Sequence, residues 1–110
     1  MRIDAYTPSP EITEIGDIAA DAERLEFDGF WVTETKRSPY TLLTVAGERT
    51  DEIEIGSAIA VAFPRSPMVT AYTARDIQQL TGGRLLLGLG AQVKGHMARR
   101  LAVEFEWARP

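Results

Sequence analysis

The sequence predicts an α/β fold built around a parallel sheet, and two observations support that prediction. Short apolar runs with strand character alternate along the chain with segments of helical periodicity, in the order β-α-β-α-β-α-β. No Asn-Gly pair, the strongest signal of a tight hairpin, stands between any two of these segments. Such alternation is typical of parallel strands that are joined by crossover helices.

The first strand and the first helix are predicted from the N-terminal quarter of the chain. Residues 1–7 form a short strand candidate, and Ser9 followed by Pro10 suits an N-cap and a first helical position. The helix is expected to end at Asp28-Gly29, since glycine readily adopts the left-handed conformation of a C-cap. Its apolar residues recur at helical spacing: Ile12, Ile15, Ile18, Ala19, Ala22 and Leu25.

The middle of the chain repeats this plan. Residues 30–34 (FWVTE) form an apolar run of aromatic and β-branched side chains, which is typical of a buried strand. A second helix is expected to begin at Pro39 and to fade near Thr50. Residues 53–63 then predict another buried strand, with a glycine and a serine near its middle.

The third helix and the last strand complete the alternation. Ser66 and Pro67 again pair an N-cap residue with a proline, and the helix is expected to stop at Gly82-Gly83. The final run, LLLGLG over residues 85–90, is apolar like a buried strand but is interrupted twice by glycine. Glycine inside a strand packs nothing, so two glycines near a strand end indicate that something approaches the backbone closely there.

The composition is that of one small globular domain over residues 1–110, with 45% hydrophobic and 25% charged residues. A net charge of −4 argues against a nucleic-acid partner. No apolar run is long enough to cross a membrane, and the N-terminus lacks the features of a secretory signal, so we expect a cytoplasmic protein. The absence of cysteine excludes disulfides and thiol nucleophiles.

Candidate site residues are sought where the strands end, because ligands of parallel α/β folds bind there. Glu34 is the only acid directly after the second predicted strand. Its carboxylate could transfer a proton or orient a hydroxyl group, or it could instead form a salt bridge with Lys36 or Arg37. The end of the last strand would present exposed backbone and one amide side chain, through Gly88, Gly90, Ala91 and Gln92.

Basic side chains gather after the last predicted strand of this acidic chain. His96, the single histidine, and Arg99 could bind an anionic group of a substrate or cofactor. The alternative is a solvated helical face. One histidine and no cysteine provide no metal-ligand spacing, so no metal is expected. No serine stands in a nucleophile-elbow sequence either.

Two segments together resemble the luciferase-like flavin and deazaflavin oxidoreductases. They are FDGFWVTET (residues 27–35) and IGSAIAVAFPRSPMVTAYTARDIQQLTGGRLLLGLGAQV (residues 55–93). The sequence from FPRSP through TGGR to LGLG is similar to the branch that uses coenzyme F-420, with FMN as the alternative cofactor. The resemblance implies a (β/α)₈ TIM barrel, commonly dimeric. It also implies hydride transfer to or from an isoalloxazine-type ring, or monooxygenation of a small organic substrate.

The resemblance further implies roles for particular residues. The third strand of this family carries a bulge, often with a non-prolyl cis peptide, that backs the tricyclic ring, and it falls here near Ala58-Ile59. Glu34 would be the catalytic acid–base group, and it would act alone because Thr35 stands where many relatives have histidine. The residues that would lie against the pyrimidine end of the ring, where glycines clear space for a flat cofactor, are Gly88, Gly90, Ala91 and Gln92.

The length departs from the family pattern. A complete barrel takes about 250 residues or more, whereas this sequence ends soon after its fourth predicted strand. We therefore expect the truncated N-terminal half of a barrel, which is not expected to catalyse alone. Its open strand edges favour self-association or a homo-oligomer. The alternative is a non-catalytic α/β module that binds a partner chain through those edges.

Overall fold

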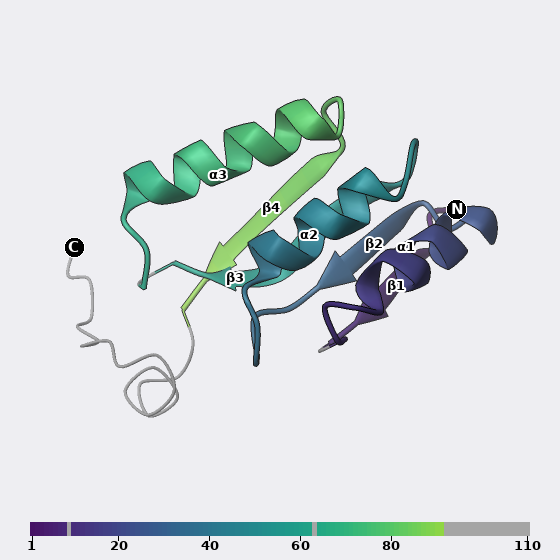
Figure 1. Cartoon of the computed structure of the whole chain (residues 1–110), viewed down its shortest axis with the longest axis horizontal. Helices are drawn as coiled ribbons and strands as arrows, with labels where there is room; N and C mark the ends of the chain where they lie inside the picture. Colours follow the sequence, from purple (N-terminus) through teal and green to yellow (C-terminus); the bar gives the residue numbers. More distant parts are fainter. Residues whose placement is uncertain (9, 63, 92–110) are drawn as a thin grey trace.

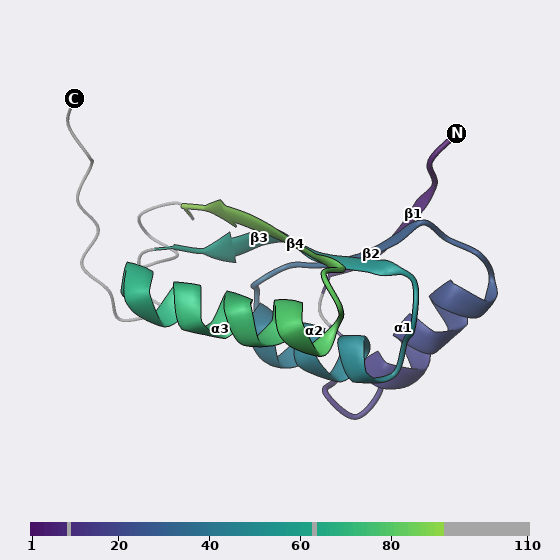
Figure 2. The ribbon, with the colours of Figure 1, turned by 90° about the horizontal axis from the view of Figure 1, so that it is seen from above.

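The computed structural model describes residues 1–8, 10–62 and 64–91. These residues form a parallel sheet with the strand order β1-β2-β3-β4, and a helix joins each strand to the next (Figure 1). The helices of the described residues all lie on one face of the sheet, as Figure 2 shows. This arrangement confirms the predicted α/β class. The elements are β1 (Asp4–Thr7), α1 (Ile15–Arg24), β2 (Gly29–Val32), α2 (Pro39–Glu48), β3 (Glu54–Val61), α3 (Pro67–Leu80) and β4 (Leu85–Gly90).

Helices α2 and α3 begin where their proline signals predict. Pro39 and Pro67 are the first residues of the two helices, where a missing N–H is tolerated. The Ser66 side chain accepts a hydrogen bond from the Val69 backbone N–H at 3.1 Å, which caps α3. After α3 the chain turns through Gly82 and Gly83, whose φ angles of 63° and 90° favour glycine.

Helix α1 is shorter than predicted at both ends. It begins at Ile15 rather than near Pro10, because the preceding residues form a turn in which the Glu11 carbonyl accepts from the Glu14 and Ile15 N–H groups at 3.0 Å. It ends at Arg24, and the chain reverses at Glu26, whose φ is 65°. The predicted C-cap at Gly29 is therefore wrong, since that residue opens β2.

The hydrophobic core lies between the sheet and the helices. The strand register aligns Phe30 of β2 with Ile55 of β3, and Ile55 with Leu85 of β4, so their side chains form one row. This row belongs to a single buried cluster with Ile15 of α1 and Leu43 of α2. Burial of each such side chain stabilises the fold by about 1.5–3 kcal/mol, so the cluster holds the sheet and helices together.

The opposite face of the sheet is open in the described part of the chain (Figure 2). The next row of side chains, aligned by the same register, is Tyr6, Trp31, Gly56 and Leu86. Tyr6 is 58% exposed there. In the described part of the chain, this row of side chains is therefore left without a covering helix.

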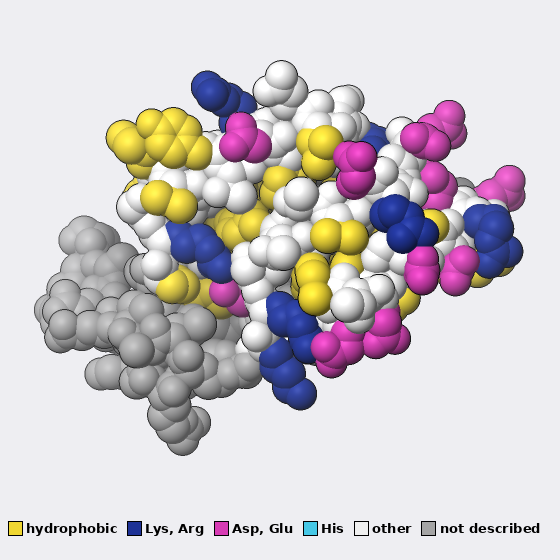
Figure 3. Space-filling model, in the orientation of Figure 1, with side chains coloured by type: hydrophobic (Ala, Val, Ile, Leu, Met, Phe, Trp, Pro, Cys, Tyr) yellow, Lys and Arg dark blue, Asp and Glu magenta, His cyan; other side chains and the backbone are white. Residues whose placement is uncertain are grey.

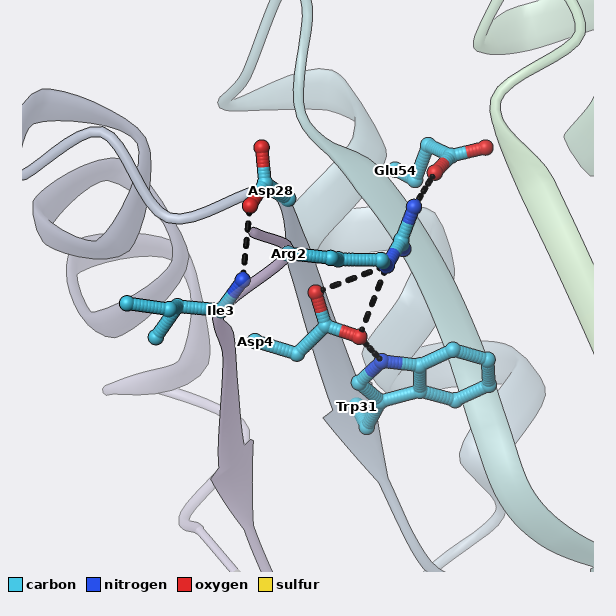
Figure 4. A network of polar contacts seen from close by, with 6 residues as sticks. All are labelled: Arg2, Ile3, Asp4, Asp28, Trp31 and Glu54. Carbon is cyan, nitrogen blue, oxygen red and sulfur yellow. Dashed lines mark hydrogen bonds and ion pairs between the residues drawn. The ribbon is translucent and has the colours of Figure 1, made fainter.

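A polar network joins the beginnings of three strands on this open face (Figure 4). Asp4 accepts hydrogen bonds from the Trp31 indole Nε1 at 2.9 Å and from the Arg2 Nε at 3.1 Å, and Arg2 also pairs with Glu54. Desolvation acts to raise the pKa of Asp4, but the hydrogen bonds from Trp31 and Arg2 outweigh it and lower that pKa. The network ties β1, β2 and β3 together.

A second polar network closes the sheet where β3 and β4 begin. The Arg84 side chain donates to the Thr81 carbonyl at 2.7 Å, to the Ile53 carbonyl at 2.9 Å and to the Gly47 carbonyl at 3.1 Å. It also donates to the Thr50 hydroxyl at 2.8 Å and to the Thr50 carbonyl at 2.9 Å. One guanidinium therefore satisfies the carbonyl groups that the ends of α2 and α3 leave unpaired.

Glu23 accepts hydrogen bonds from backbone N–H groups at the end of the sheet where β3 and β4 begin. Its carboxylate accepts from the N–H groups of Asp51, Glu52 and Ile53 at 2.7–3.1 Å. Desolvation acts to raise the pKa of Glu23, but these backbone donors and the charge of Arg84 outweigh it and lower that pKa. Glu23 and Arg84 together thus hold the loop before β3 in place.

Apolar side chains gather on the surface at the N-terminal part of α3 (Figure 3), where Met68, Val69 and Tyr72 are exposed. Helix α3 thus buries only part of its apolar surface, and Ile77 is its buried residue. Exposed apolar groups of this kind suit contact with further protein. The expected self-association stays a prediction.

Candidate functional site

The carboxyl-terminal half of β3 contains a bulge. The register with β4 shifts between Ser57 and Ala60, so that Ala58 and Ile59 lie opposite the single residue Gly88. The Ala58–Ile59 peptide bond is cis. Ala58 is exposed and Ile59 is half-buried. The expected bulge with a non-prolyl cis peptide is therefore confirmed at the predicted position.

The glycines of β4 allow this bulge to approach closely. A Cβ atom on Gly88 would overlap the Ser57 carbonyl oxygen, and one on Gly90 would overlap Cδ1 of Ile59. The Ser57 hydroxyl lies between the strands, where it donates to the Gly88 carbonyl at 2.8 Å and accepts from the Gly88 N–H at 3.0 Å. The close approach to the end of β4 is therefore made by the neighbouring strand β3, whereas the family resemblance implied that the glycines clear space for a flat cofactor. The bulge residues Ala58 and Ile59 and the two glycines together form one wall.

Glu34 follows β2 and is buried, with 7% of its surface exposed. Its Oε1 accepts from Arg65 Nη1 and its Oε2 accepts from Arg65 Nη2, both at 2.8 Å. Oε1 also accepts from the Val61 backbone N–H at 2.8 Å, and the Glu34 N–H donates to the Ile59 carbonyl at 3.2 Å. The salt bridge considered for Glu34 thus exists, but with Arg65 rather than with Lys36 or Arg37.

Arg65 lies in the loop after β3 and is held from three sides. Besides the carboxylate, it donates from Nη1 to the Val61 carbonyl at 3.0 Å. Its guanidinium carbon lies 4.8 Å from the centre of the Tyr40 ring, a cation–π arrangement. The hydrogen bonds to Glu34 raise the pKa of Arg65 against the opposing effect of desolvation. Its charge is therefore permanent.

The two threonines beside Glu34 fasten the loop after β1. Thr33 Oγ1 donates to the Pro8 carbonyl at 2.6 Å, and Thr35 Oγ1 donates to the same oxygen at 3.4 Å. Arg37 pairs instead with Glu11 at 2.7 Å. The residues after β2 therefore hold neighbouring loops at the mouth of the sheet.

Sequence reasoning did not single out Arg65 or Tyr40 as site residues. A signal for Arg65 was present, because parallel neighbouring strands end at the same edge and their following loops meet there. A lone acid after β2 and an arginine shortly after β3 are therefore candidate partners. Tyr40 carried no comparable signal in the sequence. Its hydroxyl is buried and has no hydrogen-bond partner within the described residues.

Several predicted positions have no structural test. Ala91 is exposed directly after β4. Gln92, His96 and Arg99 lie outside the described residues. Within the described part of the chain, no group of three or more His, Asp or Glu side chains could hold a metal ion. The helices described there are all too short or too polar to span a bilayer.

A groove of about 260 Å³ lies on the other side of the sheet, between α3 and β4. It is lined mostly by apolar side chains, among them Pro67, Ala71, Leu87 and Leu89. Because Leu87 and Gly88 are consecutive strand residues, the groove and the glycine wall lie on opposite faces of β4. The groove is therefore separate from the glycine wall, but Arg65 of the strand-end site also lines it.

Comparison with known proteins places the chain in a family. The family described as luciferase-like monooxygenase matches residues 1–110. An uncharacterised protein of Mycobacterium tuberculosis is 37% identical over 110 residues, which is all of this chain and 32% of that protein. The 5,10-methylenetetrahydromethanopterin reductase of Methanolobus tindarius is 31% identical over 107 residues, 96% of this chain and 32% of the enzyme. The chain thus spans about a third of the length of these relatives.

Solved structures share the fold. The coenzyme F-420-dependent tetrahydromethanopterin reductase from Methanopyrus kandleri superposes with a TM-score of 0.80 at 24% identity, over 89% of this chain and 29% of the enzyme. The oxygenating constituent of 3,6-diketocamphane monooxygenase from Pseudomonas putida, in complex with FMN, gives a TM-score of 0.79 at 16% identity, over 91% and 32%. The neighbours are barrel enzymes, and the strand order here follows one part of them. With the family match over its whole length and the β3 bulge at the expected place, the chain belongs to the luciferase-like monooxygenase family.

Proposed function

We propose that this chain supplies the ring-binding wall of a flavin- or deazaflavin-dependent oxidoreductase that acts on a small organic substrate. The observation that carries the proposal is the wall of Ala58, Ile59, Gly88 and Gly90, formed where β3 and β4 end. Ligands of parallel barrels bind at this end of the strands. The bound cofactor would accept or donate the hydride, and the protein would supply position and shape.

The residues of the wall fit a flat heterocycle. Ala58 is exposed, and Ile59, Gly88 and Gly90 are partly exposed, so backbone and apolar groups are available for contact. A planar ring gains from such a surface, because contact along its face removes apolar area from water on both partners. Ala91 and Gln92 would extend the wall past β4, and His96 and Arg99 stay candidates for an anionic group of the cofactor or substrate.

Coenzyme F-420 is the first candidate for the cofactor and FMN the second. Among the relatives named above, the one of known activity that exceeds 30% identity is a methylenetetrahydromethanopterin reductase. A solved reductase of that kind is named as dependent on coenzyme F-420. The FMN-bound monooxygenase is more distant, at 16% identity. The proposal assigns no proton transfer to Glu34, because Arg65 engages both of its carboxylate oxygens.

Titration of the purified chain with coenzyme F-420 and with FMN, followed by visible absorbance and fluorescence, tests the proposal. Saturable binding of either ring is expected, and Ala58→Glu, which places a charge on the wall, should weaken it at least tenfold. Ala71→Glu, an exposed change on α3, serves as the matched control and should leave binding unchanged. If a folded chain binds neither ring, the cofactor proposal fails and a module that pairs with a partner chain is favoured.

A further inference from the structure

The end of β2 is connected to the far side of the β3 bulge by one residue. Backbone pairing between β2 and β3 ends at Val32 and Ser57, before the bulge. Beyond the bulge, Glu34 takes over, since its N–H donates to the Ile59 carbonyl and its carboxylate accepts from the Val61 N–H. The side chain thus acts in place of a strand carbonyl that β2 no longer provides.

Arg65 keeps that carboxylate in place. A buried carboxylate is costly unless it is paired with good geometry and further hydrogen bonds. The two parallel hydrogen bonds from Arg65, each 2.8 Å, provide that pairing, and Arg65 also donates to the Val61 carbonyl. The Tyr40 ring supports the guanidinium from α2. Val61 is therefore held through both its N–H and its carbonyl by the same ion pair.

We propose that Glu34 and Arg65 form a positioning clamp that sets where the Ala58–Ile59 segment lies relative to β2. Glu34 is then a positioning residue and not the acid–base group that the sequence predicts. The clamp acts on the wall from the interior of the protein, because the Glu34 carboxylate is buried whereas Ala58 of the wall is exposed. Its importance for ring binding rests on the proposed function, but its effect on β3 does not.

Hydrogen exchange of backbone amides, measured by NMR on the chain without cofactor, tests the clamp. In Glu34→Ala, exchange of the Val61 amide should accelerate roughly tenfold or more relative to the Ile55 amide, because a hydrogen bond to a charged group is lost. Ile55 reports on the rest of the strand, since its N–H bonds to the Arg84 carbonyl. Arg65→Met should give the same pattern. If Val61 accelerates no more than Ile55 in these variants, the clamp is overturned.

Two further variants keep the test informative if the first ones unfold. Glu34→Gln retains an oxygen that can accept from Val61, so it should preserve most of the Val61 protection, whereas Arg65→Lys, which cannot chelate both oxygens, should lose it. Asp17→Ala breaks the exposed 2.7 Å pair with Arg49 and is the matched control. Equal protection of Val61 in Arg65→Lys and in the unsubstituted chain would also overturn the clamp.

The same variants separate the clamp from the proposed function. If the chain binds coenzyme F-420 or FMN, Arg65→Lys should weaken binding more than Glu34→Gln does. An acid–base role for Glu34 predicts instead that both variants bind the ring as tightly as the unsubstituted chain does, and this result would overturn the positioning role in ring binding. Failure of ring binding leaves the exchange result standing, because that result is obtained without cofactor.

Discussion

The two ends of the sheet use charged side chains in different ways. Where β3 and β4 begin, Arg84 and Glu23 pair with backbone groups of loops and helix ends, and they close that end. Where the strands finish, the Glu34 and Arg65 side chains bond to each other as well as to the Val61 backbone, and β3 bulges beside the glycines of β4. In parallel barrels the first end serves stability and the second carries the site. Charged side chains thus hold loops and helix ends at one end of the sheet, and at the other end they set the position of the bulged backbone.

The largest effect is expected at the anchoring end. Arg84→Met removes five hydrogen bonds and leaves buried or half-buried carbonyl groups without a donor. We expect a loss of about 3 kcal/mol in the free energy of unfolding, measured by urea denaturation with an unchanged m-value. Arg24→Met, which breaks an exposed pair with Asp21, is the control and should change stability by less than about 0.5 kcal/mol. Similar losses in both variants would show that the Arg84 network stabilises the fold no more than an exposed ion pair does.

A smaller effect is expected at the two glycines of the wall, and it should differ between them. Gly88→Ala brings a methyl group against the Ser57 carbonyl, which cannot move without the strand, so we expect a loss of about 2 kcal/mol. Gly90→Ala meets the flexible tip of Ile59 and should cost about 1 kcal/mol. Ile59→Val removes that tip, so it should restore the stability of Gly90→Ala but not that of Gly88→Ala. Rescue of both, or of neither, in urea denaturation would contradict the geometry of the wall.

The pH dependence of stability sharpens the comparison at the anchoring end. Because the pKa of Glu23 is lowered in the folded state, its stabilisation is present above the unfolded-state pKa and is lost as pH falls through the folded-state pKa. Glu23→Gln should therefore be less stable than the parent by about 1 kcal/mol at pH 7, and the two should converge in acid. Denaturation curves between pH 7 and pH 3 measure this. A difference that stays constant over that range would contradict the assigned cause.

The smallest effect on stability is expected for an exposed ion pair that belongs to neither the Arg84–Glu23 end nor the Glu34–Arg65 clamp. Arg49 and Asp17 lie 2.7 Å apart with both side chains half or more exposed. Asp17→Asn should lower the free energy of unfolding by less than about 0.5 kcal/mol, and salt should reduce even that difference. Thermal unfolding at low and high salt measures it. A large, salt-independent loss would show that exposed pairs anchor the sheet as the Arg84 network does.

Much of the fold could be predicted from local signals. The serine or proline starts of α2 and α3 and the Gly82-Gly83 stop lie where predicted, because such signals depend on nearby backbone alone. For α1 the same reasoning was wrong. Ser9-Pro10 and Gly29 resemble caps, yet the turn at Glu11 and the reversal at Glu26 displaced both boundaries.

The candidate site was predicted less completely. The bulge at Ala58–Ile59 was placed by the family resemblance, because a short run of small residues is compatible with tight packing beneath a helix as well as with a bulge. The pairing of Glu34 with Arg65 depends on two loops that are separated by 31 positions, and local patterns do not report such contacts. The need for glycine at positions 88 and 90 was recognised, but the neighbour that requires it could be identified only from the strand register.

Amide chemical shifts recorded during a titration with coenzyme F-420 test the central claim most directly. The account predicts that the amides of Ala58, Ile59, Gly88 and Gly90 shift in a saturable manner, while those of Asp51, Glu52 and Ile53 at the other end of the sheet stay unchanged. Shifts confined to the Asp51–Ile53 end, or to the groove between α3 and β4, would contradict the claim that the wall receives the ring.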